Sequence, residues 1–487
     1  MSFNTKHTSG TFTNWDSIDW DMVEMKVKQM QSRIVKAVKE GKWRKVKSLQ
    51  YLLVNSYYSK LLAVRRVTQN KGKNTPGVDG VRWESSAQKL KAVNSLTKNG
   101  YKAMPLRRVN IPKSNGKLRP LGIPTMKDRG MQALYLMALI PIAETTADTN
   151  SYGFRPKRSC ADAMQQMHLV LSGKYSARYV LEADIKGCFD NISHDWILRN
   201  IPLDKAMLRQ WLKAGIIENK LFSKTTKGTP QGGIISPVIA NMVLDGLEQH
   251  IIKACDIVFY KNGAKCRVSS AKRVNFIRYA DDFIITAQHK ELIIDKILPA
   301  VKEFLIIRGL EVQTEKTHIT LVADGFDFLG QTVRRFDNKL MIKPSKKSIK
   351  SVKEKLYEMI KTHCQSPTHI LIRSINPIIK GWAYYHRHVV SKLVFTSVDT
   401  YIFRALWQWA KRRHPKKSAK WVKAKYFKTI KGRSWIFCEL IDGILYTLNR
   451  METVPIRRLI KIRNGANPFD PAWDSYFEVR KTCRVRY

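Results

Sequence analysis

The chain has 487 residues, of which 87 are Lys or Arg and 39 are Asp or Glu, giving a formal net charge of +48. A soluble domain needs a net charge of only about 2 to 8, so this excess favours a polyanionic partner over a merely solvated surface. The length predicts roughly three domains. No stretch has the roughly 20 apolar residues of a membrane span, and no apolar signal core opens the chain, so we expect a cytoplasmic protein without a membrane span. The cysteines form no C-x-x-C pair, so we expect reduced thiols.

The first segment, residues 1–74, is predicted to be helical. Apolar residues recur every three or four positions from Val23 to Val38 with lysines off that stripe, which is typical of an amphipathic basic helix. Gly41 is expected to end this helix, and the leucines from Leu49 to Leu53 predict a second one. The turn cluster GKNTPGVDG at 72–80 marks the first domain boundary.

The next region runs to residue 343 and mixes strand and helix signals. Short β-branched or aromatic runs alternate with helical stretches, as in RYVLEAD at 178–184 and RVNFIRY at 273–279. This alternation predicts an α+β domain. After Lys343 the strand signals disappear and the sequence becomes helical, aromatic and basic, which predicts a separate all-α module.

The sharpest signal for chemistry is RVNFIRYADDFIIT at 273–286, where two β-rich arms flank Ala280, Asp281 and Asp282. The pattern predicts a hairpin with two adjacent carboxylates at its turn. Such carboxylates repel each other, a cost that a divalent cation offsets, whereas a solvated turn is the plainer interpretation. We favour metal binding by Asp281 and Asp282.

A second carboxylate, Asp184, ends the apolar strand of RYVLEADIKGCFD and is expected to meet the hairpin across the sheet. Transfer of a nucleotide to a 3′-hydroxyl uses two Mg²⁺ ions, one at the attacking hydroxyl and one at the leaving pyrophosphate. We predict that Asp184 and Asp281 bridge both ions. Asp282 is then the weaker or outer ligand, and the carbonyl of Ile185 is a candidate additional oxygen.

A glycine turn in TPQGGIISP, residues 229–237, is a candidate contact for a nucleotide or template strand. Gly232 and Gly233 permit close approach of the backbone, and Gln231 offers both a donor and an acceptor. A plain strand-to-helix connector is the alternative interpretation.

A basic hairpin is predicted in RRVNIPKSNGKLRPLGIP. Lys113, Lys117 and Arg119 flank its Asn-Gly turn, which would place positive charge over a triphosphate. A solvated basic hairpin is the competing interpretation, and it applies to Lys117 more than to Lys113 or Arg119, which lie beside prolines.

The run KRRHPKKSAKWVKAKYFK at 411–428 interleaves cations with aromatic residues, as phosphate contact and base stacking require. A solvated face is the usual meaning of such a run, and the sequence does not separate RNA from DNA. In the preceding helical stretch, Tyr384 and His386 are candidates for contacting RNA, with core packing as the alternative for the tyrosine. The predicted nucleic-acid contacts are Tyr384, His386, Arg412, Arg413, Lys416, Lys417, Trp421, Lys423 and Lys425.

Seven ordered segments between Thr75 and Gln331 resemble the motifs of group II intron reverse transcriptases of the bacterial type. They are PKSNGKLRPLGIP, NSYGFRPKRSC, LEADIKGCFDNISH, GTPQGGIISP, RYADD, GLEVQTEKTHI and FDFLG. TNWDSIDW near the start and the later IKGWAYYHRH extend the resemblance over nearly the whole chain.

The resemblance implies an α+β right-hand polymerase, with fingers and palm containing an antiparallel sheet, followed by an α-helical thumb. The implied domains are an N-terminal extension (1–74), fingers and palm (75–343), a thumb with maturase domain X (344–430) and a basic DNA-binding tail (431–487). NPFDPAWDSYFEVRK resembles the segment that leads into an HNH endonuclease in longer relatives, yet no nuclease motif follows it. We therefore expect no endonuclease, and a primer supplied by another nick or by a replication fork.

The resemblance also assigns roles to individual residues. The catalytic carboxylates match Asp184, Asp281 and Asp282, and the contacts to the incoming nucleotide match Lys113, Arg119 and Gln231. Phe189 matches the aromatic gate that would clash with a ribose 2′-hydroxyl, and Lys316 in GLEVQTEKT matches a palm lysine near the primer end.

These features predict an RNA-directed DNA polymerase that binds its parent group II intron RNA, promotes splicing and copies the intron into target DNA from a DNA primer. Deoxynucleoside triphosphates and two Mg²⁺ ions are the expected substrates and cofactors. A splicing cofactor with incidental polymerase activity and a domesticated host reverse transcriptase are the alternatives. The location is expected to be the bacterial cytoplasm, at the nucleoid when DNA is bound, and a homodimer is left open.

Overall fold

A computed structural model describes residues 14–112, 116, 118–219, 221–255, 259–262, 265–268, 272–337 and 339–482. The described chain forms two compact units. Unit 1 contains the residues up to Ser159, Leu181–Ile319 and Ile462–Thr482, and unit 2 contains Cys160–Val180 and Thr320–Lys461. Across these ranges, no helix combines the length and apolar character that a bilayer crossing requires.

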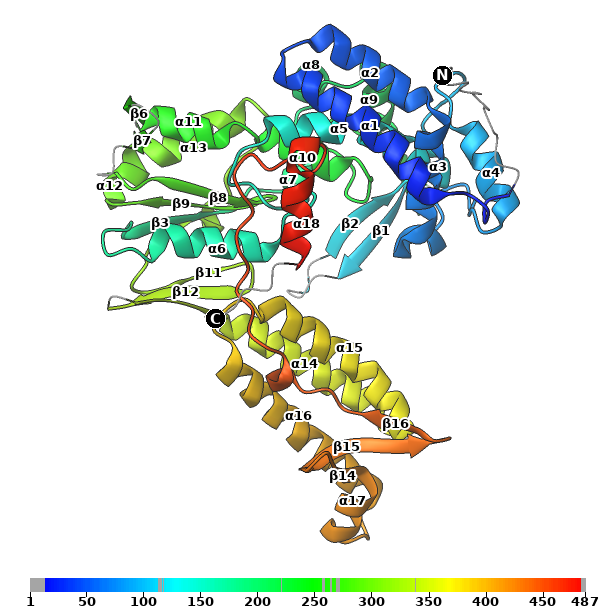
Figure 1. The fold of residues 1–487 in the computed structure, drawn as a ribbon, viewed down its shortest axis with the longest axis vertical. Coiled ribbons are helices and arrows are strands. Elements are labelled where there is room, and N and C mark those ends of the chain that lie inside the picture. The colour runs from blue at the N-terminus through cyan, green and yellow to red at the C-terminus, as the bar shows by residue number, and fades with distance from the viewer. Residues whose placement is uncertain are drawn as a thin grey trace, which may run out of the picture. The chain divides into compact units, whose positions relative to one another are not determined.

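Unit 1 begins with packed helices, as the apolar periodicity predicts (Figure 1). The Asp19 side chain caps the first helix by accepting a hydrogen bond from the backbone N–H of Met22. The apolar stripe of that helix is buried against a long, almost fully buried helix from later in the chain. These elements are α1 (Trp20–Lys39), α2 (Trp43–Asn55), α3 (Tyr57–Gln69), α4 (Ser86–Ser95) and α5 (Met126–Thr146).

A small four-stranded sheet follows in unit 1, in the order β2-β1-β4-β5. Its first two strands form the predicted hairpin, in which β1 and β2 are antiparallel, whereas β1 and β4 are parallel. The sheet consists of β1 (Leu106–Pro112), β2 (Leu118–Ile123), β4 (Ile216–Glu218) and β5 (Leu221–Ser223). The turn cluster at 72–80 is tied to α5, because Arg129 of that helix donates to the carbonyl of Gly72 at 2.8 Å.

The second sheet of unit 1 has the order β10-β3-β9-β8, and α11 and α13 lie on one face of it (Figure 1). Its strands are β3 (Tyr179–Ala183), β8 (Asn275–Tyr279), β9 (Asp282–Ala287) and β10 (His318–Leu321). The other helices and short strands of this part of unit 1 are α7 (Cys188–Asn191), α8 (His194–Asn200), α9 (Lys205–Leu212), α10 (Ser236–Leu244), α11 (Leu247–Ala254), β6 (Phe259–Asn262), β7 (Lys265–Val268), α12 (Lys290–Leu292) and α13 (Leu298–Ile306). This mixture of helix and strand is the α+β fold that the sequence predicts.

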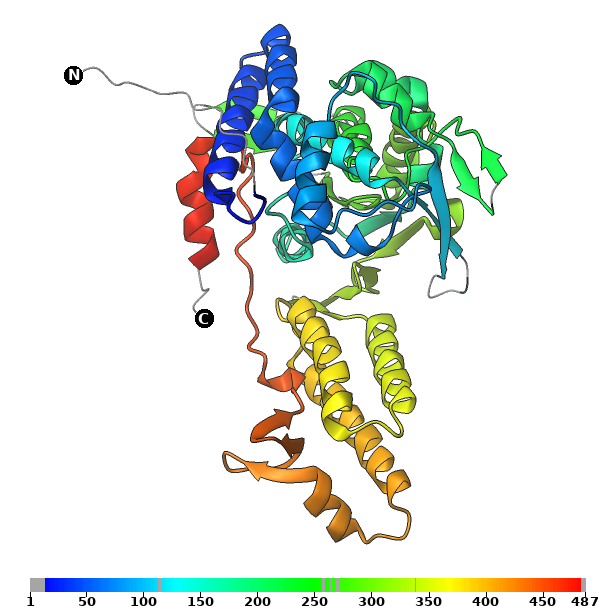
Figure 2. The same cartoon turned by 90° about the vertical axis from the view of Figure 1, so that its right-hand side faces the viewer.

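Unit 2 combines helices with two three-stranded sheets (Figure 2). Leu356, Ile375 and Phe395, on three different helices, are fully buried in one apolar cluster. The helices are α6 (Cys160–Leu171), α14 (Lys346–Thr362), α15 (Thr368–His386), α16 (Lys392–Arg413) and α17 (Ala419–Tyr426). The strands are β11 (Phe326–Phe328), β12 (Gln331–Phe336), β13 (Lys339–Pro344), β14 (Phe427–Ile430), β15 (Arg433–Ile441) and β16 (Ile444–Thr447).

The expectation that strand signals end after Lys343 is wrong for the last sheet of unit 2. β14, β15 and β16 are antiparallel, and Ile441 pairs with Ile444 across the two-residue turn Asp442-Gly443. Both turn residues have positive φ, 49° and 75°. An Asp-Gly pair between apolar alternating runs is a strong hairpin signal, and the all-α expectation overlooked it.

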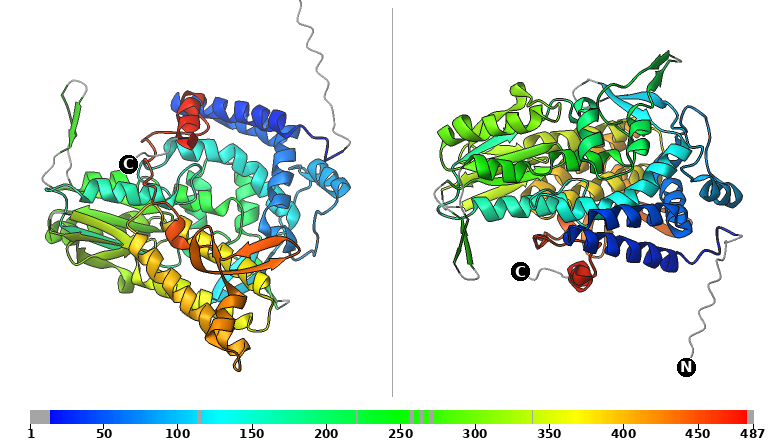
Figure 3. Two further views of the ribbon diagram at one scale, coloured as in Figure 1. Left: turned by 60° about the horizontal axis from the view of Figure 1, so that its bottom comes forward. Right: turned by 90° about the horizontal axis from the view of Figure 1, so that it is seen from above.

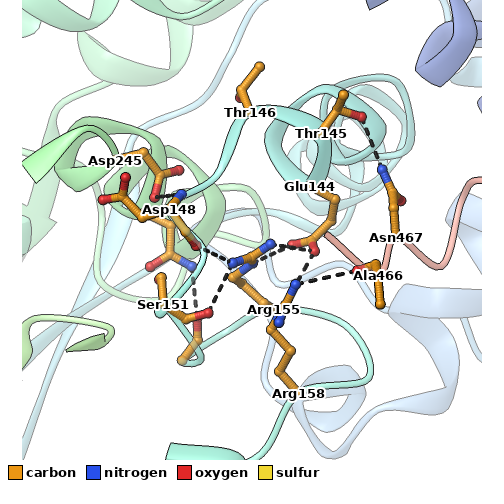
Figure 4. Close-up of polar contacts among 12 residues, drawn as sticks. Glu144, Thr145, Thr146, Asp148, Ser151, Arg155, Arg158, Asp245, Ala466 and Asn467 are labelled. Atoms are coloured by element: carbon orange, nitrogen blue, oxygen red, sulfur yellow. Dashed lines mark hydrogen bonds and ion pairs between the residues drawn. The ribbon is translucent and has the colours of Figure 1, made fainter. Parts of the chain in front are cut away.

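The segment that we expected to be one basic tail is divided between the two units. Residues 462–482, including α18 (Asp474–Thr482), belong to unit 1, and α18 lies beside α1 (Figures 2 and 3). The side chain of buried Asn467 donates to the Thr145 hydroxyl at 3.0 Å (Figure 4). Lys28 on α1 forms an ion pair of 2.7 Å with Asp474. This segment is therefore an integral part of unit 1, and DNA binding by it stays a prediction.

Loss of the buried Asn467 amide should destabilise unit 1 more than loss of an exposed ion pair. In Asn467→Ala, the Thr145 hydroxyl and the backbone N–H of Phe469 both lose a partner, which should cost about 1 to 3 kcal/mol. Lys28→Ala removes a pair whose side chains are 47% and 45% exposed, and should cost less than about 1 kcal/mol. Urea unfolding of both variants measures the difference, and equal losses would contradict this account.

His386 lies in the core of unit 2, with no exposed surface. Its Nε2 is 3.1 Å from the Ser348 hydroxyl, which also accepts from the indole N–H of Trp382 at 3.1 Å. Burial lowers the pKa of His386 to about 4, which favours the neutral imidazole at neutral pH. The expected RNA contact by His386 is corrected here, because the side chain is inside the protein.

The neutral state of His386 makes unit 2 sensitive to acid. The unfolded histidine titrates near 6.5 and the folded one near 4, so the unfolded chain binds more protons between these values. The neutral histidine contributes its full stabilisation above about pH 6.5, and this contribution is lost as the pH falls toward 4. The loss is about 2 kcal/mol at pH 5. Comparing urea unfolding at pH 7 and pH 5, His386→Leu should lose about this much of the pH dependence, whereas His289→Asn, at an exposed position, should retain it.

Candidate active site and nucleic-acid interface

Asp281 and Asp282 lie at the tip of the β8–β9 hairpin, as predicted. Tyr279 pairs with Asp282, so Ala280 and Asp281 form a two-residue loop; the four residues are called the carboxylate turn below. Ala280 has a φ of 59°, which tight hairpin loops require at their first position. The rest of β9 is buried, so the packing of its apolar residues fixes where the two carboxylates stand.

Asp184 follows directly after β3, which is the neighbour of β9 in the sheet. Its carbonyl accepts a hydrogen bond from the backbone N–H of Gln313 at 2.8 Å. The next residue, Ile185, is buried and forms an antiparallel bridge with Val312. Backbone pairing therefore fixes this strand end, and the role of the Ile185 carbonyl as a metal ligand stays a prediction.

The three carboxylates share one electrostatic environment. Burial raises the pKa of Asp282 to about 6, and the charges of Asp281 and Asp184 act in the same direction. The pKa of Asp281 is raised as well, first by burial and then by Asp184. Because each charge disfavours the others, the ionised state of the group requires a compensating cation.

One such cation is a side chain, Lys316, whose Nζ lies 2.6 Å from Oδ2 of Asp184. This hydrogen bond, followed by the charges of all three carboxylates, raises the pKa of Lys316. Within the described ranges, no three His, Cys, Asp or Glu side chains already surround a common point as metal ligands. The ammonium group of Lys316 thus occupies one oxygen of Asp184. A donor set made only of carboxylate oxygens suits a hard divalent cation, so the residues fit a metal of the Mg²⁺ type.

Arg119 faces the carboxylates from the basic hairpin. It lies on β2, opposite Ile111 of β1. Its charge acts to lower the pKa of Asp281 and so opposes part of the rise that burial causes. The contact of Arg119 with the phosphates of a nucleotide stays a prediction. Lys113, the other expected nucleotide contact from this hairpin, lies outside the described residues.

Gln231 lies in a glycine turn that contacts two other motifs. Its side-chain nitrogen donates to Oδ2 of Asp190 at 3.1 Å, and its carbonyl accepts from the backbone N–H of Gly122 at 2.8 Å. Gly232 has a φ of 125°, and a Cβ there would lie 2.7 Å from the carbonyl of Gly122. The structure thus joins the turn to β2 and α7, and the nucleotide contact of Gln231 stays a prediction.

Phe189, the expected sugar gate, packs edge-on against Phe154, with ring centroids 6.4 Å apart. Phe154 comes from NSYGFRP and is 54% exposed, with a φ of 56°. No role was predicted for Phe154; the signal that could have found it is an aromatic side chain next to a glycine in a motif of polar residues. The exposed ring of Phe154 and the half-buried ring of Phe189 thus form one aromatic pair from distant segments.

The basic aromatic run of unit 2 forms pairs of cations and rings. Lys417 and Lys425 place their ammonium groups 5.6 and 5.0 Å from the ring centroid of Trp421, which is 36% exposed. Lys423 lies 4.6 Å from the ring of Trp435 on β15. Such pairs present both charge and a stacking face to solvent.

The remaining predicted contacts lie near this run or on α15. Arg412 and Arg413 line one pocket of unit 2, and the guanidinium of Arg413 lies 4.6 Å from the Trp409 ring. Lys416 is exposed. Tyr384 is 46% exposed beside the guanidinium of Arg387. Apart from His386, the predicted nucleic-acid contacts are thus at least partly accessible, and their role stays a prediction.

Comparison with known families covers most of the chain. Residues 111–333 match the family described as reverse transcriptase (RNA-dependent DNA polymerase), and residues 15–96 match the N-terminal domain of reverse transcriptase. Residues 349–427 match the group II intron maturase-specific domain. These families imply nucleic-acid substrates, binding of intron RNA and use of divalent metal ions.

Individual relatives agree with the families. Protein YkfC of Escherichia coli (strain K12) is 36% identical over 304 residues, which is 56% of this chain and 79% of that protein. Group II intron-encoded protein LtrA of Lactococcus lactis subsp. cremoris is 32% identical over 340 residues, 58% of this chain and 56% of LtrA. The putative COX1/OXI3 intron 1 protein of Saccharomyces cerevisiae is 30% identical over 321 residues, 56% of this chain and 38% of that protein. The chain therefore belongs to the group II intron-encoded reverse transcriptases, RNA-directed DNA polymerases that carry a maturase-specific domain.

Proposed function

We propose that unit 1 adds deoxynucleotides to a primer 3′-hydroxyl at Asp184, Asp281 and Asp282, with two Mg²⁺ ions as cofactors. The observation that carries this proposal is the meeting of carboxylates from two distant segments beside Lys316, where the charge of Asp184 acts to raise the pKa of both Asp281 and Asp282. When bound, the ions supply Lewis acidity at the attacking hydroxyl and at the leaving pyrophosphate. Asp184 and Asp281 would each contact both ions, Asp282 would be the outer ligand, and the Ile185 carbonyl would add one oxygen.

The residues around the carboxylates have distinct parts in this proposal. Arg119 and Lys113 would hold the triphosphate, and Gln231 would orient the nucleotide base or template strand. Lys316 bonds Asp184 in this structure and would turn to the primer end once a metal ion takes over that carboxylate. Phe189, supported by Phe154, would exclude a 2′-hydroxyl.

Unit 2 would bind RNA through its exposed cations and rings. Trp421 with Lys417 and Lys425 offers one base-stacking face with adjacent positive charge. The partner would be the parent group II intron RNA, as the maturase-specific domain favours. Binding would promote splicing, and reverse transcription from a DNA primer at a target site would then make the intron mobile. The homodimer and the nucleoid-associated cytoplasmic location belong to the same proposal.

Replacing Asp281 by Asn should abolish primer extension and leave RNA binding intact. Asparagine keeps the side-chain size but removes the charge that a metal ion needs. The measurement is extension of an oligo(dT) primer on poly(rA) with dTTP and Mg²⁺. Asp295→Asn, a change at an exposed acid of unit 1, should extend normally, and EDTA should stop the wild type. Extension by Asp281→Asn at the wild-type rate would overturn the assignment.

The same variant separates a polymerase from a splicing cofactor. If unit 2 binds intron RNA as proposed, Asp281→Asn should still promote splicing of the parent intron while copying nothing. Normal splicing without any extension by the wild type would instead favour a splicing cofactor. Loss of both activities in Asp281→Asn, with the Asp295→Asn control active, would contradict independent roles for the two units.

Truncation of Phe189 should weaken the choice of deoxynucleotides. Removal of the ring opens space for a 2′-hydroxyl, so the ratio of dTTP to UTP incorporation should fall roughly 10- to 100-fold. Phe154→Ala should give a smaller fall in the same direction, because Phe154 only supports the Phe189 ring. Phe222→Ala, at an exposed ring on β5, serves as the matched control, and an unchanged ratio in Phe189→Ala contradicts the gate.

A further inference from the structure

Strand β8 carries a buried arginine directly before the carboxylate turn. Arg278 has no exposed surface, although it lies only three residues from Asp281. A buried guanidinium is costly unless it is paired and hydrogen-bonded. The burial of this charged side chain inside an apolar strand therefore requires partners that offset its cost.

The guanidinium is held on two sides by one segment. Nη2 of Arg278 forms an ion pair with Oδ1 of Asp245, and Nη1 donates to Oδ1 of Asn241 at 3.1 Å. Asn241 lies on α10 and Asp245 directly follows that helix. Asp245 is fixed in turn, because its carboxylate accepts from the backbone N–H of Asp148 at 3.4 Å.

The same guanidinium reaches into the carboxylate turn. Nη1 of Arg278 also lies within hydrogen-bond range of the carbonyl of Ala280, at 3.4 Å. Ala280 is the residue with positive φ between Tyr279 and Asp281. A donor on its carbonyl sets the orientation of the peptide plane that joins Ala280 to Asp281.

A loop from the NSYGFRP motif closes the other side of the turn. The backbone N–H of Tyr152 donates to the carbonyl of Arg278 at 2.9 Å, and the Asn241 side chain donates to the carbonyl of Gly153 at 2.8 Å. A Cβ at Gly153 would lie only 2.3 Å from the backbone nitrogen of Ala280. The loop backbone thus packs directly on the turn, and Asn241 links the loop to Arg278.

This loop is itself braced by a buried ion pair. Arg155 contacts both oxygens of Glu144 at 2.9 Å and donates to the carbonyls of Asp148 and Ser151 at 2.8 and 2.9 Å (Figure 4). Both side chains of the pair are at most 4% exposed. Arg158 adds a bond from the loop to the carbonyl of Ala466 (Figure 4).

We propose that Arg278 is a positioning residue for the polymerase reaction: its fork, clamped by Asp245 and Asn241, holds the Ala280 carbonyl and thereby aims Asp281 and Asp282. The inference rests on the metal-binding role proposed above for these two carboxylates. It goes beyond that role because Arg278 touches neither metal nor substrate. A lysine has the charge for Asp245 but lacks the planar fork that reaches Asn241 and Ala280 together.

Arg278→Lys tests the proposal with oligo(dT) extension on poly(rA). Displacement of the carboxylates by a fraction of an ångström should lower kcat roughly 10- to 100-fold. The KM for dTTP should change less than threefold, because nucleotide contacts come from other segments. The Mg²⁺ concentration for half-maximal rate should rise several-fold, which a merely destabilised protein would not show.

Arg308→Lys is the matched control. Its guanidinium also donates to backbone carbonyls of unit 1, those of Val243 and Phe304, each at 2.7 Å. It should lose stability without a shift in the Mg²⁺ dependence. If Arg278→Lys does not fold, Asp245→Asn carries the same test, because it keeps the size but removes the ion pair.

The outcomes separate this inference from the proposed function. An inactive wild type would defeat the proposed function itself. An active wild type, together with a folded Arg278→Lys variant of unchanged kcat and unchanged Mg²⁺ dependence, would overturn only the positioning role. A Mg²⁺ shift of equal size in Arg308→Lys would also overturn it, because the effect would then follow general loss of stability.

Discussion

Mutual repulsion among Asp184, Asp281 and Asp282 is the constraint around which unit 1 is built. Folding brings these carboxylates together and partly removes them from water, which raises the pKa of Asp282 to about 6. Such an arrangement opposes folding unless cations offset it. Lys316 bonds Asp184, Arg119 acts on Asp281, and buried Arg278 supports the turn from behind. The fold therefore tolerates an acidic centre because Lys316 and Arg119 offset its charge, while Arg278 supports its backbone.

The same centre explains how a chain with a net charge of +48 can hold a polyanion and still react with it. Positive charge over the surface attracts nucleic acid and lowers the cost of approach. At the reacting atoms, however, three carboxylates would repel both a primer end and a triphosphate. In the mechanism proposed above, a divalent ion would resolve this conflict, because it would neutralise the acids and attract the phosphates at one point. The affinity for nucleic acid thus depends on the basic surface, whereas the chemistry depends on the acidic centre.

The sequence was informative where one short segment determines both structure and chemistry. The carboxylate turn could be predicted because apolar strands on both sides leave only a hairpin, and the α+β class followed from the same alternation. Interactions between distant segments were not visible. Nothing local to β8 indicates that Arg278 meets Asp245 and Asn241. The expectation of an all-α module also overlooked the Asp-Gly turn and the apolar runs on either side of it, which form β15 and β16.

Charge composition also hides a distinction that burial reveals. Most of the 87 basic residues look alike in sequence, and an arginine within RYADD invites the interpretation of a nucleic-acid contact. The structure gives Arg278 no exposed surface, so it cannot touch a nucleic acid from its place behind the turn. An arginine suits this position because its planar fork donates in several fixed directions, whereas the three donors of a lysine radiate from a single atom. The value of the residue lies in geometry rather than in net charge. An acidic site whose members repel one another needs rigid backbone support, and a buried, paired guanidinium supplies that support without competing for the metal ion.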